Sequence, residues 1–203
     1  MMKHPQIIFA TKNPHKVAEV RFILKGYGLQ ICSMDEVLDI PDIEESGQTF
    51  EENALLKAHA VFERTQGWCL ADDSGLEVDV LNGSPGIYSA RFAGTPGDYS
   101  ANNRKLLELM KDIPDSQRGA QFRCVVAIVG PNFSTTVEGI VRGHIVHKPR
   151  GRKGFGYDPL FIPKGYQQTF AEMDETRKNQ ISHRAIAFRK AAAILLRLFE
   201  SSI

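Results

Sequence analysis

The first 33 residues constrain the fold most strongly, because they join two short apolar runs through one amphipathic segment. The run QIIFA (6–10) is typical of a buried strand, and LQICS (29–33) of a second one. Between them a polar turn leads to Pro14, which suits the first turn of a helix, and apolar side chains recur to about Gly26. A strand, a helix and a further strand in this order predict an α/β fold.

The remaining chain continues with helices, strands and two long glycine-rich loops. Thr49 is followed three residues later by Glu52, a capping-box pattern that predicts a helix through TFEENALLKAHAVFERT. We expect WCLA and LEVDV to be two strands on either side of a turn at the adjacent Asp72 and Asp73. Further on we expect the helix NNRKLLELMKDI, a strand pair joined by GPNF, and a last helix capped by Ser182. Residues 1–203 are interpreted as a single domain.

Composition narrows the class of protein. The 203 residues include 42% hydrophobic ones, enough for a sizeable core, and 25 basic against 24 acidic side chains, a net charge of +1. This balance does not favour a nucleic-acid partner. The widely spaced Cys32, Cys69 and Cys124 indicate reduced thiols rather than a zinc site. The apolar run near the N-terminus is too short for a signal peptide, and no run could span a bilayer, so a cytoplasmic protein is expected.

The adjacent carboxylates of Asp72 and Asp73 follow an apolar run directly. Like charges this close cost free energy unless a positive group lies beside them. Mg²⁺ is one solution, with Glu44 and Glu45 as further carboxylates, since hard oxygen ligands suit that ion. The alternatives are a surface turn for the aspartates and a solvated acidic loop for the glutamates.

Four further segments carry candidate ligand-binding side chains. Thr11, Asn13 and Lys16 lie between a strand end and a helix start, where free N–H groups favour phosphate, although a plain turn is an alternative. Phe155, within glycine-rich GRKGFGYDP, offers a surface for stacking on a base. The basic run at 147–153 is a candidate RNA-binding arm. At the start of the last helix the helix dipole disfavours positive side chains, and an anionic or carbonyl-rich ligand would offset this, although a capped surface helix can also tolerate them; these side chains are Lys178, His183 and Arg184.

Together these segments resemble the family of inosine/xanthosine triphosphate pyrophosphatases. The matching segments occur in the family's order and span Phe9 to Ala191; they are FATKNPHKVAEV, ESGQTFEENALLKA, ADDSGLEVDVLNGSPGIYSARFAG, GFGYDPLFIP and ISHRAIAFRKA. The resemblance implies hydrolysis of non-canonical purine nucleoside triphosphates (ITP, dITP and XTP) to the monophosphate and pyrophosphate, which cleanses the nucleotide pool. It also implies an α/β fold with a long central mixed sheet flanked by helices, two lobes with a deep substrate cleft, Mg²⁺ as cofactor and a homodimer. No stable nucleic-acid or membrane partner is implied.

The resemblance also assigns roles to individual residues. Asp73 would be the catalytic base and, with Glu44, would bind Mg²⁺. The triphosphate would contact the first loop and a lysine of the second motif: Thr11, Lys12, Asn13, Pro14, His15, Lys16 and Lys57. Ser74 would also contact the substrate, and the purine would be held by Phe155, Gly156, Tyr157, Asp158, Lys178, His183 and Arg184. The family commonly has Asn-x-Gly-Lys in the first loop, whereas here His15 precedes Lys16 and Lys12 replaces a small residue.

Three alternatives stay open at this stage. A related pyrophosphatase could act on modified pyrimidines, although SHR and FGYD favour oxopurines. A nucleotide sensor without turnover would not need the carboxylates of Asp73 and Glu44. An RNA-binding module would use the arm at 147–153 and would bind in a strongly salt-dependent way.

Overall fold

The computed structural model describes residues 6–37, 41 and 43–200. The first five residues and positions 39, 40 and 42 of the acidic loop lie outside the described residues. The chain forms two compact units by its internal contacts. Unit 1 comprises Met1–Asp73, Cys124–Gly139 and Arg184–Ile203, and unit 2 comprises Ser74–Arg123 and Ile140–His183.

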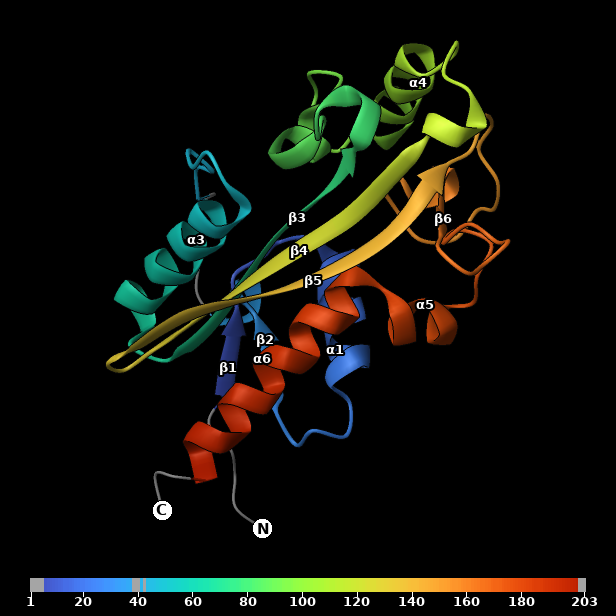
Figure 1. Cartoon of the computed structure of the whole chain (residues 1–203). Coiled ribbons are helices and arrows are strands. Elements are labelled where there is room, and N and C mark those ends of the chain that lie inside the picture. Colours follow the sequence, from blue (N-terminus) through green and yellow to red (C-terminus); the bar gives the residue numbers. More distant parts are fainter. Residues whose placement is uncertain (1–5, 38–40, 42, 201–203) are drawn as a thin grey trace. The chain divides into compact units, whose positions relative to one another are not determined.

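Six strands form a sheet in the order β2-β1-β3-β4-β5-β6. They are β1 (Gln6–Phe9), β2 (Gln30–Ser33), β3 (Trp68–Val78), β4 (Gly119–Gly130), β5 (Phe133–Ile145) and β6 (Phe161–Pro163). Strand β1 pairs parallel with β2 and β3, whereas β5 pairs antiparallel with β6. The predicted α/β fold with a mixed sheet and flanking helices is therefore confirmed (Figure 1).

Unit 1 contains the predicted strand, helix and strand of the first 33 residues. Helix α1 (Pro14–Leu24) connects β1 to β2, and α2 (Met34–Val37) follows directly. The last helix, α6 (His183–Glu200), packs with α1 over one face of the strands, where Phe9 and Phe188 meet edge to face at 5.3 Å between ring centroids. Burying these side chains stabilises this part of the fold.

Helix α3 (Phe50–Thr65) confirms the capping prediction. The side-chain oxygen of Thr49 accepts a hydrogen bond from the backbone N–H of Glu52 at 3.1 Å, which satisfies one of the unpaired donors at the helix start. Its buried side chains recur at helical spacing and include Asn53, Ala54, Lys57, Ala58 and Val61. One face of α3 therefore faces the interior of unit 1.

The predicted turn at Asp72 and Asp73 is wrong. Strand β3 runs without interruption from Trp68 to Val78 through both aspartates and the Ser-Gly pair that follows. The prediction assumed that two adjacent charges must leave the sheet. In the structure both aspartates are buried, at 1% and 5% exposure, because cationic side chains lie beside each of them.

Unit 2 contains α4 (Tyr99–Leu109) and α5 (Glu175–Ile181). Helix α4 begins three residues before the predicted segment, because Asp98 caps it by accepting from the N–H of Ala101 at 2.9 Å. The short β6 and α5 were not predicted. The unit's core combines side chains of the strands and their loops, among them Leu76, Phe122, Phe161 and Phe170.

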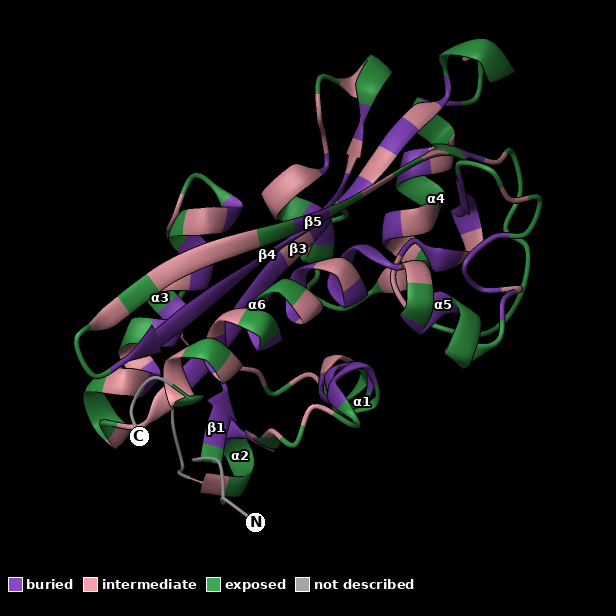
Figure 2. Cartoon of the chain, turned by 60° about the horizontal axis from the view of Figure 1, so that its bottom comes forward, coloured by how far each residue is buried: buried purple, intermediate pink, exposed green. Residues whose placement is uncertain are grey.

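Burial differs between the two longest strands. Strand β4 is buried along nearly its whole length, whereas β5 is mostly half-buried or exposed (Figure 2). For this reason the sequence of β4 is a nearly continuous apolar run, whereas that of β5 mixes apolar and polar residues. Within the described part of the chain, no helix is both long and apolar enough to cross a membrane.

Candidate active site

The alternation of side chains along β3 sends Asp72 and Asp73 to opposite faces of the sheet. Leu70 belongs to the core formed with α1 and α6, so Asp72, two residues on, faces the same side. Cys69 lies beside Thr65 of α3, with 3.7 Å between Sγ and Oγ1, and Asp73 follows it on that second face. Adjacent carboxylates are thereby separated without a turn.

Asp72 lies between two cations of unit 1. Its Oδ1 accepts from the ammonium of Lys16 at 3.0 Å, and its Oδ2 from the guanidinium of Arg184 at 3.1 and 3.3 Å. Complete burial opposes ionisation, but the charges of Lys16 and Arg184 outweigh it and hold the pKa of Asp72 well below its usual range. Asp72 therefore stays ionised and holds Lys16 and Arg184 in place, and it does not act as a proton acceptor.

Asp73 is in a different electrostatic environment. Burial raises its pKa to about 6, and the negative charge of Glu45 adds to the rise. Lys57, with its Nζ 3.8 Å from Oδ1, and Asn53, which donates to Oδ2 at 3.0 Å, oppose this rise only in part. A carboxylate with a pKa near neutrality can accept a proton from water at physiological pH.

Lys57 links the acidic loop to Asp73. Its ammonium forms an ion pair with Glu45, and although burial acts against the charge, Asp73 and Glu45 raise the pKa of Lys57. Glu44, the predicted metal ligand, is exposed. Its neighbour Glu45 is the carboxylate that forms the ion pair with Lys57. Among the described residues, no group of three or more His, Cys, Asp or Glu side chains is arranged to hold a metal ion.

The first loop is partly used by its own helix cap. The Oδ1 of Asn13 accepts from the N–H groups of His15 and Lys16, and the Oγ1 of Thr11 accepts from the N–H of Asn13. The expectation of free backbone donors is therefore wrong for the N–H groups of Asn13, His15 and Lys16. Lys12, Pro14 and His15 are exposed, while the side chain of Lys16 is 17% exposed.

The predicted purine-binding residues lie in unit 2, except for Arg184, which belongs to unit 1, and three of those in unit 2 meet at a buried ion pair. The ammonium of Lys178 lies 2.6 Å from Oδ2 of Asp158 and 5.0 Å from the ring centroid of Phe155. The same carboxylate oxygen accepts from the N–H of Phe155 at 2.9 Å. Gly154 adopts φ +72°, and a Cβ there would meet that oxygen at 2.1 Å, so the close approach requires glycine.

Neighbouring side chains support this loop. The hydroxyl of Tyr157 donates to the backbone carbonyl of Ser89 at 3.0 Å. The ring of His183 stacks on Phe122 with 4.6 Å between centroids. Phe155 is half-buried, as are Gly156 and Ser74, the first residue of unit 2.

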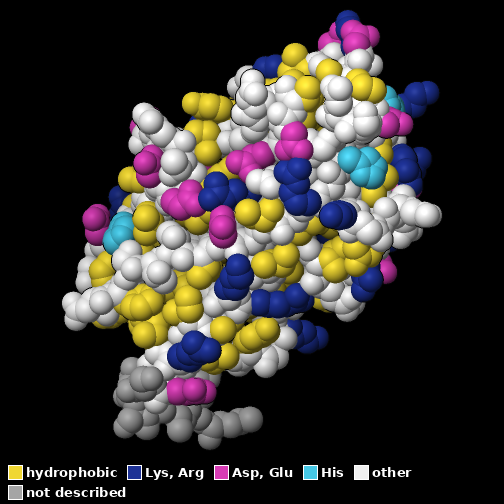
Figure 3. All heavy atoms as spheres, in the orientation of Figure 1, with side chains coloured by type: hydrophobic (Ala, Val, Ile, Leu, Met, Phe, Trp, Pro, Cys, Tyr) yellow, Lys and Arg dark blue, Asp and Glu magenta, His cyan; other side chains and the backbone are white. Residues whose placement is uncertain are grey.

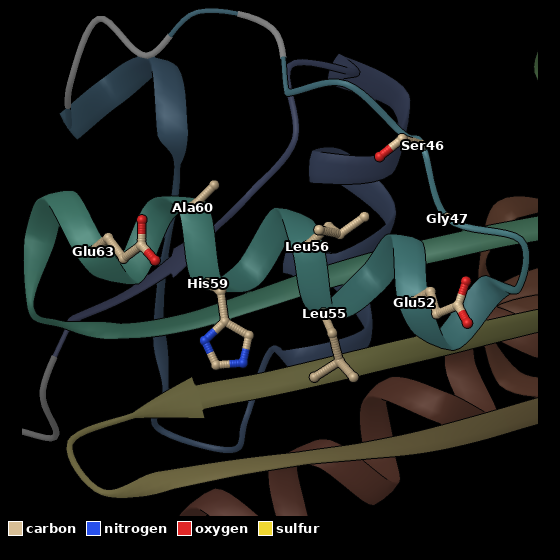
Figure 4. Close-up of a pocket in the computed structure, with 8 residues that line it drawn as sticks. All are labelled: Ser46, Gly47, Glu52, Leu55, Leu56, His59, Ala60 and Glu63. Carbon is tan, nitrogen blue, oxygen red and sulfur yellow. The ribbon is translucent and has the colours of Figure 1, made fainter.

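Two pockets differ in what they could bind. In unit 2 a pocket of about 380 Å³ is lined by both aromatic and cationic side chains, including Tyr99, Phe155, Arg104, Arg152 and Lys153. In unit 1 a pocket of about 540 Å³ lies along the outer side of α3 (Figure 4). Its eight lining residues include Glu52 and Glu63 but neither Lys nor Arg, which disfavours a phosphate ligand there.

The basic arm at 147–153 is partly neutralised. Arg150 forms an ion pair with Glu172 at 2.9 Å, and the ring of His147 lies 2.6 Å from a carboxylate oxygen of Asp115. On the face shown in Figure 3, Lys and Arg side chains are interspersed with Asp and Glu. These pairings weaken the case for an RNA-binding arm, because phosphate binding depends on unneutralised positive charge.

Comparison with known proteins identifies the family. The model of the Ham1 family matches residues 7–194. The chain belongs to the Ham1 family. It is 51% identical to a Desulforamulus reducens protein named dITP/XTP pyrophosphatase, with 96% of this chain and 97% of that protein covered.

Two solved Ham1 structures have the same fold. That of Coxiella burnetii has a TM-score of 0.86 and 38% identity, covering 95% of this chain and 99% of the other. That of Staphylococcus aureus has a TM-score of 0.83 and 39% identity, covering 94% and 97%. The predicted family resemblance is confirmed.

Sequence reasoning missed three partners of the predicted site. Asn53 lies one helical turn before Lys57 and so shares its face of α3, a spacing that could have indicated its place beside Asp73. Glu45 was considered only as a further carboxylate for Mg²⁺ and not as the partner of Lys57. No local pattern indicated Glu19, which lies on α1 beside Arg184, a residue 165 positions later in the chain.

Proposed function

We propose that this protein hydrolyses dITP, ITP and XTP to the nucleoside monophosphate and pyrophosphate. Membership of the Ham1 family and the names of close relatives support the substrate class. The observation that carries the reaction is the electrostatic contrast on β3, where Asp72 is held ionised and Asp73 has a pKa of about 6. We further propose that it acts in the cytoplasm as a homodimer.

The phosphates would be bound in unit 1. Thr11, Asn13 and Lys16 lie at the start of α1, whose dipole favours anions, and Lys57 adds a buried positive charge. Transfer of a phosphoryl group depends mainly on positioning and charge neutralisation, which these cations supply. Lys12, exposed beside them, extends the positive surface, and His15 is exposed there as well.

A divalent cation fits the chemistry of this cluster. Burial and the neighbouring Glu45 raise the pKa of Asp73, which means that its carboxylate lacks sufficient compensating positive charge. Mg²⁺ needs only one or two protein carboxylates when it also binds substrate phosphates. We propose that Asp73 and a glutamate of the acidic loop, Glu44 or Glu45, hold it. When bound, Mg²⁺ would neutralise phosphate charge and increase the acidity of nearby water.

Asp73 would act as the general base. A water oxygen attacks the α-phosphorus, the bond from that phosphorus to the α–β bridging oxygen breaks, and pyrophosphate leaves. The proton of the attacking water moves to the carboxylate of Asp73, which Asn53 and Lys57 orient. No covalent enzyme intermediate is required.

The base would be recognised in unit 2. Phe155 would stack on the purine, and Lys178, held by Asp158, would donate to the 6-oxo group. An adenine amino group would instead place donor against donor, and such mismatches produce large discrimination. Tyr157, Gly156, Ser74 and His183 would shape or contact the remainder of the bound nucleotide.

Replacement of Phe155 by alanine tests the stacking role. We expect binding of XTP to weaken by about 1–3 kcal/mol, the range for loss of one base–aromatic stack. Titration calorimetry with a nonhydrolysable XTP analogue measures this. Replacement of the exposed Tyr88, which lies in the same unit outside the loop, is the control and should leave the affinity unchanged. An unaltered affinity in the Phe155 variant would place the ring outside the base site.

The reaction itself is tested by product analysis. The purified protein is incubated with Mg²⁺ and, separately, ITP, XTP, dATP and dGTP, and the released phosphate species are identified. We expect pyrophosphate with ITP and XTP only. Orthophosphate would indicate attack at another phosphorus and contradict the mechanism, and binding without any product would favour a nucleotide sensor.

A further inference from the structure

Four charged side chains of unit 1, Asp72 among them, form three consecutive ion pairs that we call the ring, because one helix joins its two ends. Lys16 and Glu19 lie three residues apart on α1, Asp72 lies on β3, and Arg184 lies at the start of α6. The guanidinium donates to Oε2 of Glu19 at 2.7 Å and to Oδ2 of Asp72 at 3.1 Å. The ammonium of Lys16 donates to the other Asp72 oxygen at 3.0 Å. The ring therefore begins and ends on the same helix.

Burial makes this arrangement unusual. The side chains of Asp72, Arg184 and Glu19 are 0%, 2% and 9% exposed. Removing ionised groups from water costs free energy, so well-packed apolar residues would often be at least as stable in their place. The ring is therefore better explained by the geometry that it imposes than by stability alone.

That geometry ends at Lys16, the most exposed member at 17%. Arg184 occupies one oxygen of Asp72 and so leaves the other oxygen for the ammonium. Glu19 in turn holds a different nitrogen of the guanidinium, which prevents it from rotating away from Asp72. Each contact fixes the next one along the ring.

We propose that Glu19 is a positioning residue that acts through Arg184 and Asp72 to hold the ammonium of Lys16 where it binds substrate phosphate. The inference rests on the proposed function only in taking Lys16 as a phosphate contact. It assigns to Arg184 a role within unit 1 in addition to the base contact that the family resemblance implies.

A double-mutant cycle on phosphate binding tests the proposal without depending on turnover. Inorganic tripolyphosphate with Mg²⁺ is titrated by calorimetry into the wild-type protein, Glu19→Gln, Lys16→Met and the double variant. Glu19→Gln keeps the shape of the side chain but removes its charge. We expect it to weaken binding about five- to twentyfold in the wild-type background and to have no effect once Lys16 is methionine, because residues that act through one another are non-additive.

The control variant is Glu36→Gln. It also removes one carboxylate charge that is paired with an arginine of α1, since Glu36 lies 2.5 Å from Arg21, but both side chains are more than 40% exposed. We expect it to bind tripolyphosphate as the wild type does. If Glu19→Gln does not fold, as judged by its thermal melt, Arg184→Lys replaces it, since a lysine cannot contact both carboxylates in the same way.

Two results would overturn the proposal. Equal weakening by Glu19→Gln in the presence and absence of Lys16 would mean a general structural effect. No weakening in either background would mean that the ring does not control phosphate binding. Because tripolyphosphate contains no base and is not the substrate, failure of the proposed hydrolysis would appear in the product assay and not in this cycle.

Discussion

Replacing Asp73 by asparagine is expected to reduce turnover of XTP by roughly 10²–10⁴, the usual contribution of a general base. The amide has the shape of the carboxylate but cannot accept a proton from the attacking water. Asn53 and Lys57 would remain in place around it. Steady-state release of pyrophosphate measures the loss, and near-normal turnover would show that another group is the base.

The same variant is expected to be more stable than the wild type when metal is absent. Burial raises the pKa of Asp73 from 3.8 to about 6, so above pH 6 the folded protein carries an ionised group that folding disfavours. About two units of pKa correspond to roughly 3 kcal/mol, and we expect a gain of about 1–3 kcal/mol at pH 8 because Lys57 also loses a partner.

The pH dependence of this gain has a definite sign. As the pH falls from 6 to 4, the folded wild type takes up a proton that the unfolded chain does not, so the wild type gains stability relative to the variant. The difference should therefore shrink over this window. Urea unfolding with EDTA at pH 8 and pH 5 measures it. Asp35→Asn, at an exposed position of α2, is the control and should show no such trend.

Replacing Arg118 by methionine is expected to cause the largest loss of stability, about 3–5 kcal/mol. Arg118 is 1% exposed, and its guanidinium donates to four backbone carbonyls of unit 2: Met110, Ile113, Ile145 and Val146. Burial lowers the pKa of Arg118, and the negative charge of Asp115 offsets part of this effect. Methionine would fill much of the volume and leave these acceptors without their donor.

The effect of Arg118 is measured by urea unfolding followed by circular dichroism. Total stabilities of domains are commonly about 5–15 kcal/mol, so the expected loss is a large fraction. Arg142→Met is the matched control, because Arg142 is half exposed and its ion pair with Asp79 should contribute no more than about 1 kcal/mol. A loss below 1 kcal/mol for Arg118→Met would contradict the structural role.

The Arg118 carbonyl contacts also connect local structure to the candidate site. They join the end of α4 to the end of β5, directly before the loop that carries Phe155. If the Arg118 variant keeps partial activity, we therefore expect it to bind purine nucleotides more weakly, while Asp73 remains the general base. Arg118 and the loop that carries Phe155 therefore belong to a part of unit 2 that we expect to unfold cooperatively.

Local patterns determined much of this protein before any tertiary contact was considered. The first strand, helix and strand followed from apolar periodicity, and the start of α3 followed from the Thr49 cap. These features depend on residues within one or two turns of each other, which is why the sequence alone is sufficient for them. The ordered motifs likewise indicated the family.

Only the tertiary structure decided how two adjacent aspartates are tolerated. The sequence favoured a turn, whereas β3 continues and divides them between two faces, one lined by α1 and α6 and the other by α3. Burial opposes the ionisation of both, but Lys16 and Arg184 hold the pKa of Asp72 below its usual range, whereas Lys57 offsets only part of the rise at Asp73. These cations are distant along the chain and come together only on folding. Electrostatic environment depends on distance and burial in space, and neither can be read from neighbours in sequence.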